Sequence, residues 1–158
     1  MKTLKNKILE GLKITSKTKV SKSGEDIETF DDFTNYYKSQ LKYHNSVRII
    51  PKKDSDLYNK LNDILNININ DEKNYNKFIK DTKDYKTNKY HLDLKSSIQK
   101  KTICCFDTKG TVAGTIEILL GSNDDIIINN LSGIVNYREQ EELLLLIKGL
   151  NYMISEFV

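Results

Sequence analysis

The last third of the chain constrains the fold most, because it joins a strongly apolar strand to a long apolar helix. Residues 126–128 are three consecutive isoleucines, and this β-branched run predicts a strand that is buried on both faces. After a polar stretch, apolar side chains recur at near-helical spacing up to residue 157. The members of this helical pattern are Leu143, Leu146, Ile147, Leu150, Met153, Ile154 and Phe157.

Further strands are predicted before this unit. Residues 102–107 and 111–120 are apolar stretches separated by a short segment that begins with Asp107 and ends with Gly110. Aspartate first and glycine fourth fit a type I turn with a glycine bulge, which predicts a hairpin. Residues 47–50 predict a short strand closed by the only proline of the chain, and residues 90–94 predict a weak strand or an extended connection.

Three helices are predicted ahead of the hairpin. One covers about residues 25–42, with Ser23 or Thr29 as its cap, and two more begin after Asp54 or Ser55 and at Asp71. The expected fold class is therefore α+β, a small and mainly antiparallel sheet packed by a long C-terminal helix and two or three N-terminal helices. Residues 25–158 form this single domain, preceded by a basic leader and flexible linker over residues 1–24.

Charge is distributed unevenly along the chain. Residues 1–22 contain seven lysines and one glutamate, a charge of +6, so the rest of the chain carries −3 of the net +3. A mildly acidic body disfavours nucleic acid as its partner. The sequence lacks both an apolar run of roughly 18 residues and a signal-peptide core, which predicts a soluble protein outside the classical secretion route and the membrane.

The two cysteines, Cys104 and Cys105, are adjacent within a predicted strand. Neighbouring strand residues point to opposite faces, so a disulfide between them would be strained, and we expect free buried thiols in a reducing compartment. His44 and His91 do not form a recognised zinc spacing with these cysteines, so no metal site is expected.

The order of the residues in the leader is more informative about function than their composition. A basic stretch is followed by Ile8, Leu9, Glu10 and Gly11, and this resembles the capsid-targeting leader of internal head proteins in T-even-type tailed phages. The resemblance implies delivery into the assembling prohead and cleavage after Glu10 by the prohead protease, with Ile8, Glu10 and Gly11 as the processing site. Without the resemblance, the leader is predicted to be a short surface helix, or a basic amphipathic helix that contacts anionic membranes.

A second resemblance concerns residues 47–157. Their order of strand, two helices, hairpin, strand and helix resembles the first two thirds of the Gcn5-related N-acetyltransferase (GNAT) fold. Residues 112–116 look like that family's Val-Gly strand, and Val135, Tyr137 and Arg138 look like the approach to its acetyl-CoA loop. The resemblance implies acetyl-CoA as a cofactor held by those three residues.

The chemistry of that loop argues against a competent cofactor site. Glycine allows a pyrophosphate to approach a helix N-terminus closely, but Glu141 stands where the family's first loop glycine belongs, between Glu139 and Glu142. Like charges at roughly 4–6 Å cost on the order of 1 kcal/mol each near solvent. The family's later strands are also not present in the sequence. We therefore name no catalytic residue, and an acyltransferase would need a second protomer to complete it.

Three functions follow as expectations. The leading one is a phage protein that is packaged in the capsid interior through contacts of its leader with the prohead scaffold or protease. It then acts in the host cytoplasm by binding an unknown host protein, including a role in counter-defence, without a cofactor. The alternatives are a dimeric GNAT-like acyltransferase or pseudo-acetyltransferase, and an interaction protein of the toxin–antitoxin kind whose basic leader is a partner-binding arm.

Overall fold

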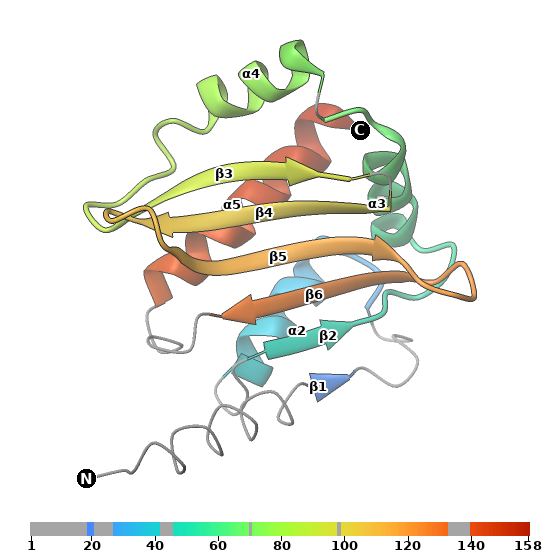
Figure 1. The fold of residues 1–158 in the computed structure, drawn as a ribbon. Helices are drawn as coiled ribbons and strands as arrows, with labels where there is room; N and C mark the ends of the chain where they lie inside the picture. The colour runs from blue at the N-terminus through green and yellow to red at the C-terminus, as the bar shows by residue number, and fades with distance from the viewer. Residues whose placement is uncertain (1–18, 21–26, 42–45, 70, 98, 133–139) are drawn as a thin grey trace, which may run out of the picture.

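The fold was analysed in a computed structural model, which describes residues 19–20, 27–41, 46–69, 71–97, 99–132 and 140–158. It is an α+β fold in which a six-stranded sheet packs against helices, as the sequence predicts (Figure 1). The strands are β1 (Lys19–Val20), β2 (Ser46–Ile49), β3 (Tyr90–Ser96), β4 (Lys100–Asp107), β5 (Val112–Leu120) and β6 (Ile126–Ser132). The described helices are α2 (Phe30–Leu41), α3 (Asp56–Asn66), α4 (Glu72–Asp81) and α5 (Gln140–Phe157).

The strand order of the sheet is β1-β2-β6-β5-β4-β3. Strands β3 to β6 pair in sequence as an antiparallel meander, and β2 then pairs with β6, so that Ile49 lies opposite Ile128. At the far edge β1 pairs in parallel with β2, with Lys19 opposite Val47. Lys19 and Val20 lie in the stretch that the sequence predicts as linker, so part of that stretch belongs to the sheet.

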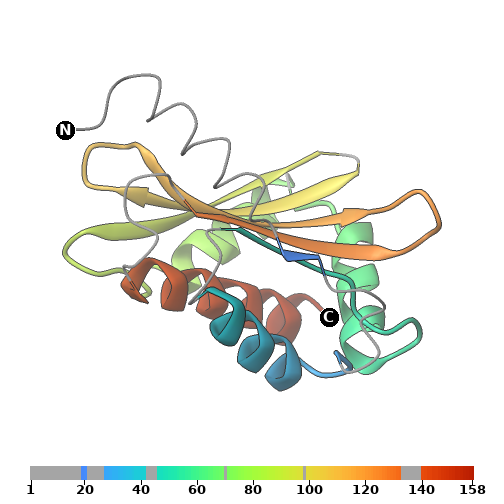
Figure 2. The same ribbon diagram turned by 90° about the horizontal axis from the view of Figure 1, so that it is seen from below.

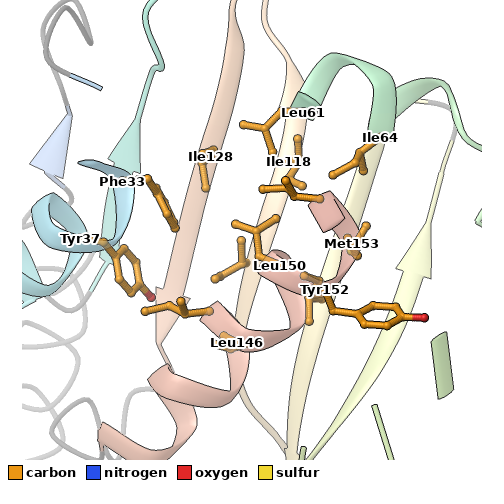
Figure 3. Packing of buried hydrophobic residues seen from close by; sticks show 14 of the residues in the cluster. Phe33, Tyr37, Leu61, Ile64, Ile118, Ile128, Leu146, Leu150, Tyr152 and Met153 are labelled. Atoms are coloured by element: carbon orange, nitrogen blue, oxygen red, sulfur yellow. The ribbon is translucent and has the colours of Figure 1, made fainter. Parts of the chain in front are cut away.

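Helices α2, α3 and α5 cover the same face of the sheet (Figure 2), and α4 lies along the edge strand β3 (Figure 1). The core forms between this face and the helices, because residues opposite one another on neighbouring strands share a face. Ile103 lies opposite Ile116, and Ile118 lies opposite Ile128. Side chains from three helices meet these isoleucines (Figure 3), and the fully buried ones include Phe33, Tyr37, Leu61, Ile64, Leu146, Leu150 and Met153.

Local hydrogen bonds explain where the helices begin. The Ser55 side chain caps α3 by accepting from the backbone N–H of Tyr58 at 3.2 Å, and Asp71 caps α4 in the same manner. At α2, Thr29 Oγ1 accepts from the Asp32 N–H and the Asp32 carboxylate accepts from the Thr29 N–H, both at 3.1 Å. These hydrogen bonds confirm Ser55, Asp71 and Thr29 as predicted helix starts. Because Thr29 caps α2, this helix begins at Phe30, later than the predicted start at about residue 25.

The turn between β4 and β5 has the predicted geometry. Gly110 has a φ of 79°, a backbone conformation that is energetically unfavourable for a residue with a Cβ atom. Its N–H donates to the Asp107 carbonyl at 3.1 Å, while Asp107 Oδ1 accepts from the backbone N–H groups of Lys109 and Thr111, both at 2.9 Å. One oxygen of the Asp107 carboxylate is therefore engaged by the turn.

Strand β6 and helix α5, whose apolar patterns are the strongest in the sequence, also supply much of the core. Ile126, Ile127 and Ile128 are buried on both faces of β6, as predicted. On α5, Leu146, Ile147, Leu150, Met153 and Ile154 are buried, and the predicted Phe157 is partly buried. Leu145 and Tyr152 are buried as well, outside the predicted pattern, whereas the side chain of Leu143 lies outside the described set.

Candidate functional site

The residues that the two resemblances single out lie outside the described ranges. This holds for the processing residues Ile8, Glu10 and Gly11 and for the acetyl-CoA residues Val135, Tyr137 and Arg138. The structure describes only the frame of the cofactor loop, since β6 ends at Ser132 and α5 begins at Gln140. The leader and the loop therefore stay predictions, and other candidate sites lie among the described residues.

The first group of interest is a set of buried polar side chains between α2, α5 and the sheet. Tyr37 of α2 is fully buried, and its hydroxyl oxygen has no hydrogen-bond partner among the described residues. Burial, and secondly the negative charge of Glu142, hold the pKa of Tyr37 well above its ordinary value. We expected Glu142 among the carboxylates at the helix start that would repel a pyrophosphate, and in the structure this residue is buried, with 4% exposed.

This arrangement predicts that Tyr37→Phe stabilises the protein. The substitution keeps the ring, which stacks on Phe33 at a centroid distance of 5.5 Å, and removes a hydroxyl that is buried without a partner. Such an unsatisfied group costs about 1–3 kcal/mol, so the free energy of unfolding should rise by up to that amount. Urea denaturation checks it, with Tyr36→Phe on the same helix as the half-buried control. A loss of stability in Tyr37→Phe would show that the hydroxyl is satisfied.

The two cysteines are free and buried, as predicted. Cys105 lies in the core opposite Gly114, and Cys104 points to the other face of the sheet, opposite Thr115. Burial raises the pKa of the Cys105 thiol to about 12 and raises that of Cys104 as well. Since the thiolate is the nucleophile, neither thiol is activated at neutral pH.

A second polar cluster joins α4 to the end of α5. Tyr152 Oη donates to Asp81 Oδ2 at 2.6 Å, and the Lys77 ammonium lies 3.4 Å from the same oxygen and 3.6 Å from Glu156 Oε2. The Lys77 ammonium is also 5.5 Å from the ring centroids of Tyr152 and Phe157. The hydrogen bond from Tyr152 lowers the pKa of Asp81, while burial, followed by that bond, raises the pKa of Tyr152. These contacts tie α4 to the end of α5, so this cluster acts as a structural clamp.

Helix α4 is held to the sheet by one further bond. Tyr75 Oη donates to Asp93 Oδ1 at 2.7 Å, and this bond is the main reason that the pKa of Tyr75 rises to about 12. Asp93 Oδ1 also accepts from the backbone N–H of Leu94 at 2.7 Å. Asp93 Oδ1 is thus occupied by two donors within the protein, so this contact too serves the fold.

The described residues offer neither a metal centre nor a membrane-spanning helix. They contain no group of three or more His, Cys, Asp or Glu side chains that could hold a metal ion. None of their helices combines the length and the apolar character needed to cross a membrane.

The remaining candidate is the sheet face that points away from α2, α3 and α5, which we call the open face (Figure 2). His91 on β3 lies opposite Phe106 on β4, and their rings stack at a centroid distance of 5.6 Å and an angle of 20°. Val112 on β5 lies opposite Phe106 and is 43% exposed. We call His91, Phe106 and Val112 the aromatic patch, and the Lys95 ammonium lies 5.8 Å from the Phe106 ring centroid.

Sequence reasoning missed the aromatic patch, although a signal for it was present. In β3 the core residues Tyr90, Leu92 and Leu94 alternate with outward residues, so the same period of two that predicts a strand also places His91 and Lys95 together on the other face. Phe106 shares this face with Cys104 by the same alternation, and Val112 reaches it because the register between β4 and β5 shifts between Cys105 and Phe106. A register shift of this kind is invisible in the sequence pattern.

Comparisons with known proteins add no family to this description: no protein-family model, curated protein or solved structure matches the chain. The class that the structure itself defines is an α+β domain with helices on one sheet face and an aromatic patch on the other.

Proposed function

We propose that this protein is a binding protein that a tailed phage packages inside its capsid and delivers into the host cytoplasm. There the folded body binds a host protein and blocks a defence or metabolic function. The observation that carries the binding role is the open face, which bears the stacked rings of His91 and Phe106 and an exposed Val112. Helices α2, α3 and α5 lie on the opposite face of the sheet (Figure 2).

The polar groups of the described part favour binding over catalysis. Cys105 and Tyr75 have pKa values raised to about 12, so both stay protonated at neutral pH. Asp81 and Asp93 are held by tyrosine hydroxyls at 2.6 and 2.7 Å. General acid–base catalysis needs a group that is free to exchange a proton with the substrate, and these four groups are either kept protonated or already hydrogen-bonded within the fold.

The packaging role rests on the leader. Its charge of +6 contrasts with the −3 of the remainder, and Ile8, Glu10 and Gly11 fit the pattern of a prohead-protease site. A basic arm of this kind suits contacts with the prohead scaffold or protease before cleavage. The described elements all lie downstream of this site, so processing leaves the domain whole.

Intact mass spectrometry of the protein from purified virions tests the proposal. We expect a mature chain that begins at Gly11, and a chain of full length when virions carry Glu10→Ala. Glu72→Ala, an exposed glutamate in the first turn of α4, is the matched control and should be processed normally. A wild-type chain that still begins at Met1 in virions contradicts cleavage, and its absence from virions contradicts packaging.

A further inference from the structure

We propose that helix α4 is a latch, which detaches from the domain and unfolds as one unit while the other elements stay folded. The helix (Glu72–Asp81) lies along the edge strand β3 (Figure 1). Its opening uncovers the outer edge of β3 and the ring of Tyr152, against which Phe78 packs at a centroid distance of 5.7 Å. The latch is a property of the fold itself and does not depend on packaging in a capsid.

The apolar attachment of α4 to the domain is small. All ten residues of this helix belong to the described part, and only Phe78 among them is buried. Helix α3, with 11 residues, buries Leu57, Leu61 and Ile64, each with 0% exposed. Burial of apolar surface is the main force that holds a helix in a fold, and regions with few buried apolar side chains open at a lower free energy than the core. We therefore expect α4 to open before α3 and α5.

A detached α4 does not remain a helix. Isolated helices shorter than about 12–15 residues are marginal in water, because the first turn is unfavourable to nucleate and few hydrogen bonds follow it. With 10 residues, α4 falls below this length. Detachment and unfolding therefore occur together, and the conformational entropy that the unfolded segment regains favours opening further. This coupling gives α4 two states, one docked and helical and the other detached and unfolded.

Two tyrosine hydrogen bonds fasten the closed latch, one in its first half and one at its last residue. Tyr75 Oη of α4 donates to Asp93 Oδ1 of β3 at 2.7 Å. Asp81 Oδ2 accepts from Tyr152 Oη of α5 at 2.6 Å, and the Lys77 ammonium lies 3.2 Å from the same hydroxyl. Hydrogen bonds to carboxylates contribute more to stability than bonds between neutral groups. Because both bonds require a docked α4, loss of either one shifts the equilibrium toward the open state.

Hydrogen exchange of the full chain under native conditions tests the latch. The backbone N–H groups of Tyr75 and Thr82 report on its two ends, and they donate to the carbonyl oxygens four residues earlier, both at 2.9 Å. After correction for intrinsic rates, we expect both amides to exchange about a hundredfold faster or more than the amide of Leu150 in the core of α5. Low concentrations of urea should change their exchange only weakly, because the open latch exposes little of the surface that global unfolding exposes.

Two variants test whether the two ends of α4 open together. Tyr75→Phe removes the bond to β3, and Tyr152→Phe removes the bond to α5, while both variants keep the aromatic ring. Each variant should accelerate exchange at positions 75 and 82 alike. The expected acceleration is about tenfold or more, the size that follows from losing a hydrogen bond to a charged group.

The matched control is Tyr58→Phe, which removes a tyrosine hydroxyl that donates to the Asp124 carbonyl at 2.9 Å, outside the latch. That bond persists when only the latch opens, so exchange at positions 75 and 82 should stay unchanged, whatever the effect at Leu150. Exchange at these two positions that is as slow as at Leu150 in the wild type overturns the latch. Acceleration confined to the end nearest each substitution, or a response of both positions to Tyr58→Phe, overturns it as well.

Discussion

Replacing Leu150 by alanine is expected to lower the free energy of unfolding by about 3 kcal/mol, within the usual 2–5 kcal/mol for a buried leucine. Leu150 is fully buried in the middle of α5, where it faces the isoleucines of the sheet (Figure 3). The loss combines apolar surface that returns to water with a cavity that the rigid sheet cannot fill. Equilibrium urea denaturation, followed by circular dichroism, measures the effect.

Leu144 provides the matched control on the same helix, because its side chain is 48% exposed. Leu144→Ala keeps the same change of residue type, so both variants alter helix propensity equally, and it should change stability by less than about 0.5 kcal/mol. Similar losses in the two variants would contradict the placement of α5, because they would mean that Leu150 does not face the core.

Gly149→Val is expected to cost about 3 kcal/mol or more by overfilling the contact between α5 and the sheet, at the upper end of the effects seen in overpacked cores. A Cβ atom at Gly149 would lie 3.1 Å from Leu92 Cδ1 and 3.2 Å from Ile103 Cγ2. Valine adds two methyl groups beyond the Cβ atom, and the Cβ atom alone already lies closer to these side chains than an ordinary van der Waals contact. Neither β3 nor β4 can move away from α5, because each is hydrogen-bonded to a neighbouring strand along its length.

Two comparison variants separate packing from helix propensity. Asn151→Val places the same residue at an exposed position of α5 and should cost only the propensity difference, a few tenths of a kcal/mol. Gly149→Ala should fall between the wild type and Gly149→Val, because its gain in helix propensity of about 1 kcal/mol offsets part of the contact. If Gly149→Val were as stable as Asn151→Val, the close approach of α5 to β3 and β4 would be wrong.

The sequence predicts the elements of this fold well because their signals are local. The isoleucines at residues 126–128, the Asp107–Gly110 turn and the caps at Ser55 and Asp71 each depend on neighbouring residues, and the structure confirms all of them. Even the uncertain stretch at residues 90–94 is a strand, since its alternation reflects one buried and one open face.

Non-local features escape this kind of reasoning. Nothing in residues 46–49 specifies that β2 pairs with β6, and a two-residue strand such as Lys19–Val20 has no periodicity to detect. Glu142 is misjudged for the same reason, because its burial depends on α2, more than 100 residues away. The aromatic patch depends on three strands and a register shift, so its residues come together only once the sheet is assembled.

The two ends of the sheet have a consequence for behaviour at high concentration. An open strand edge is a template on which other chains can add strands and aggregate. Here the long edge strand β3 is flanked by α4, which the bond from Tyr75 to Asp93 holds in place, while the opposite edge strand β1 has only two residues. Within the described residues, neither edge offers a long free ladder to a second copy. We therefore expect many copies at high concentration in a confined volume to remain folded and not to aggregate through their strand edges.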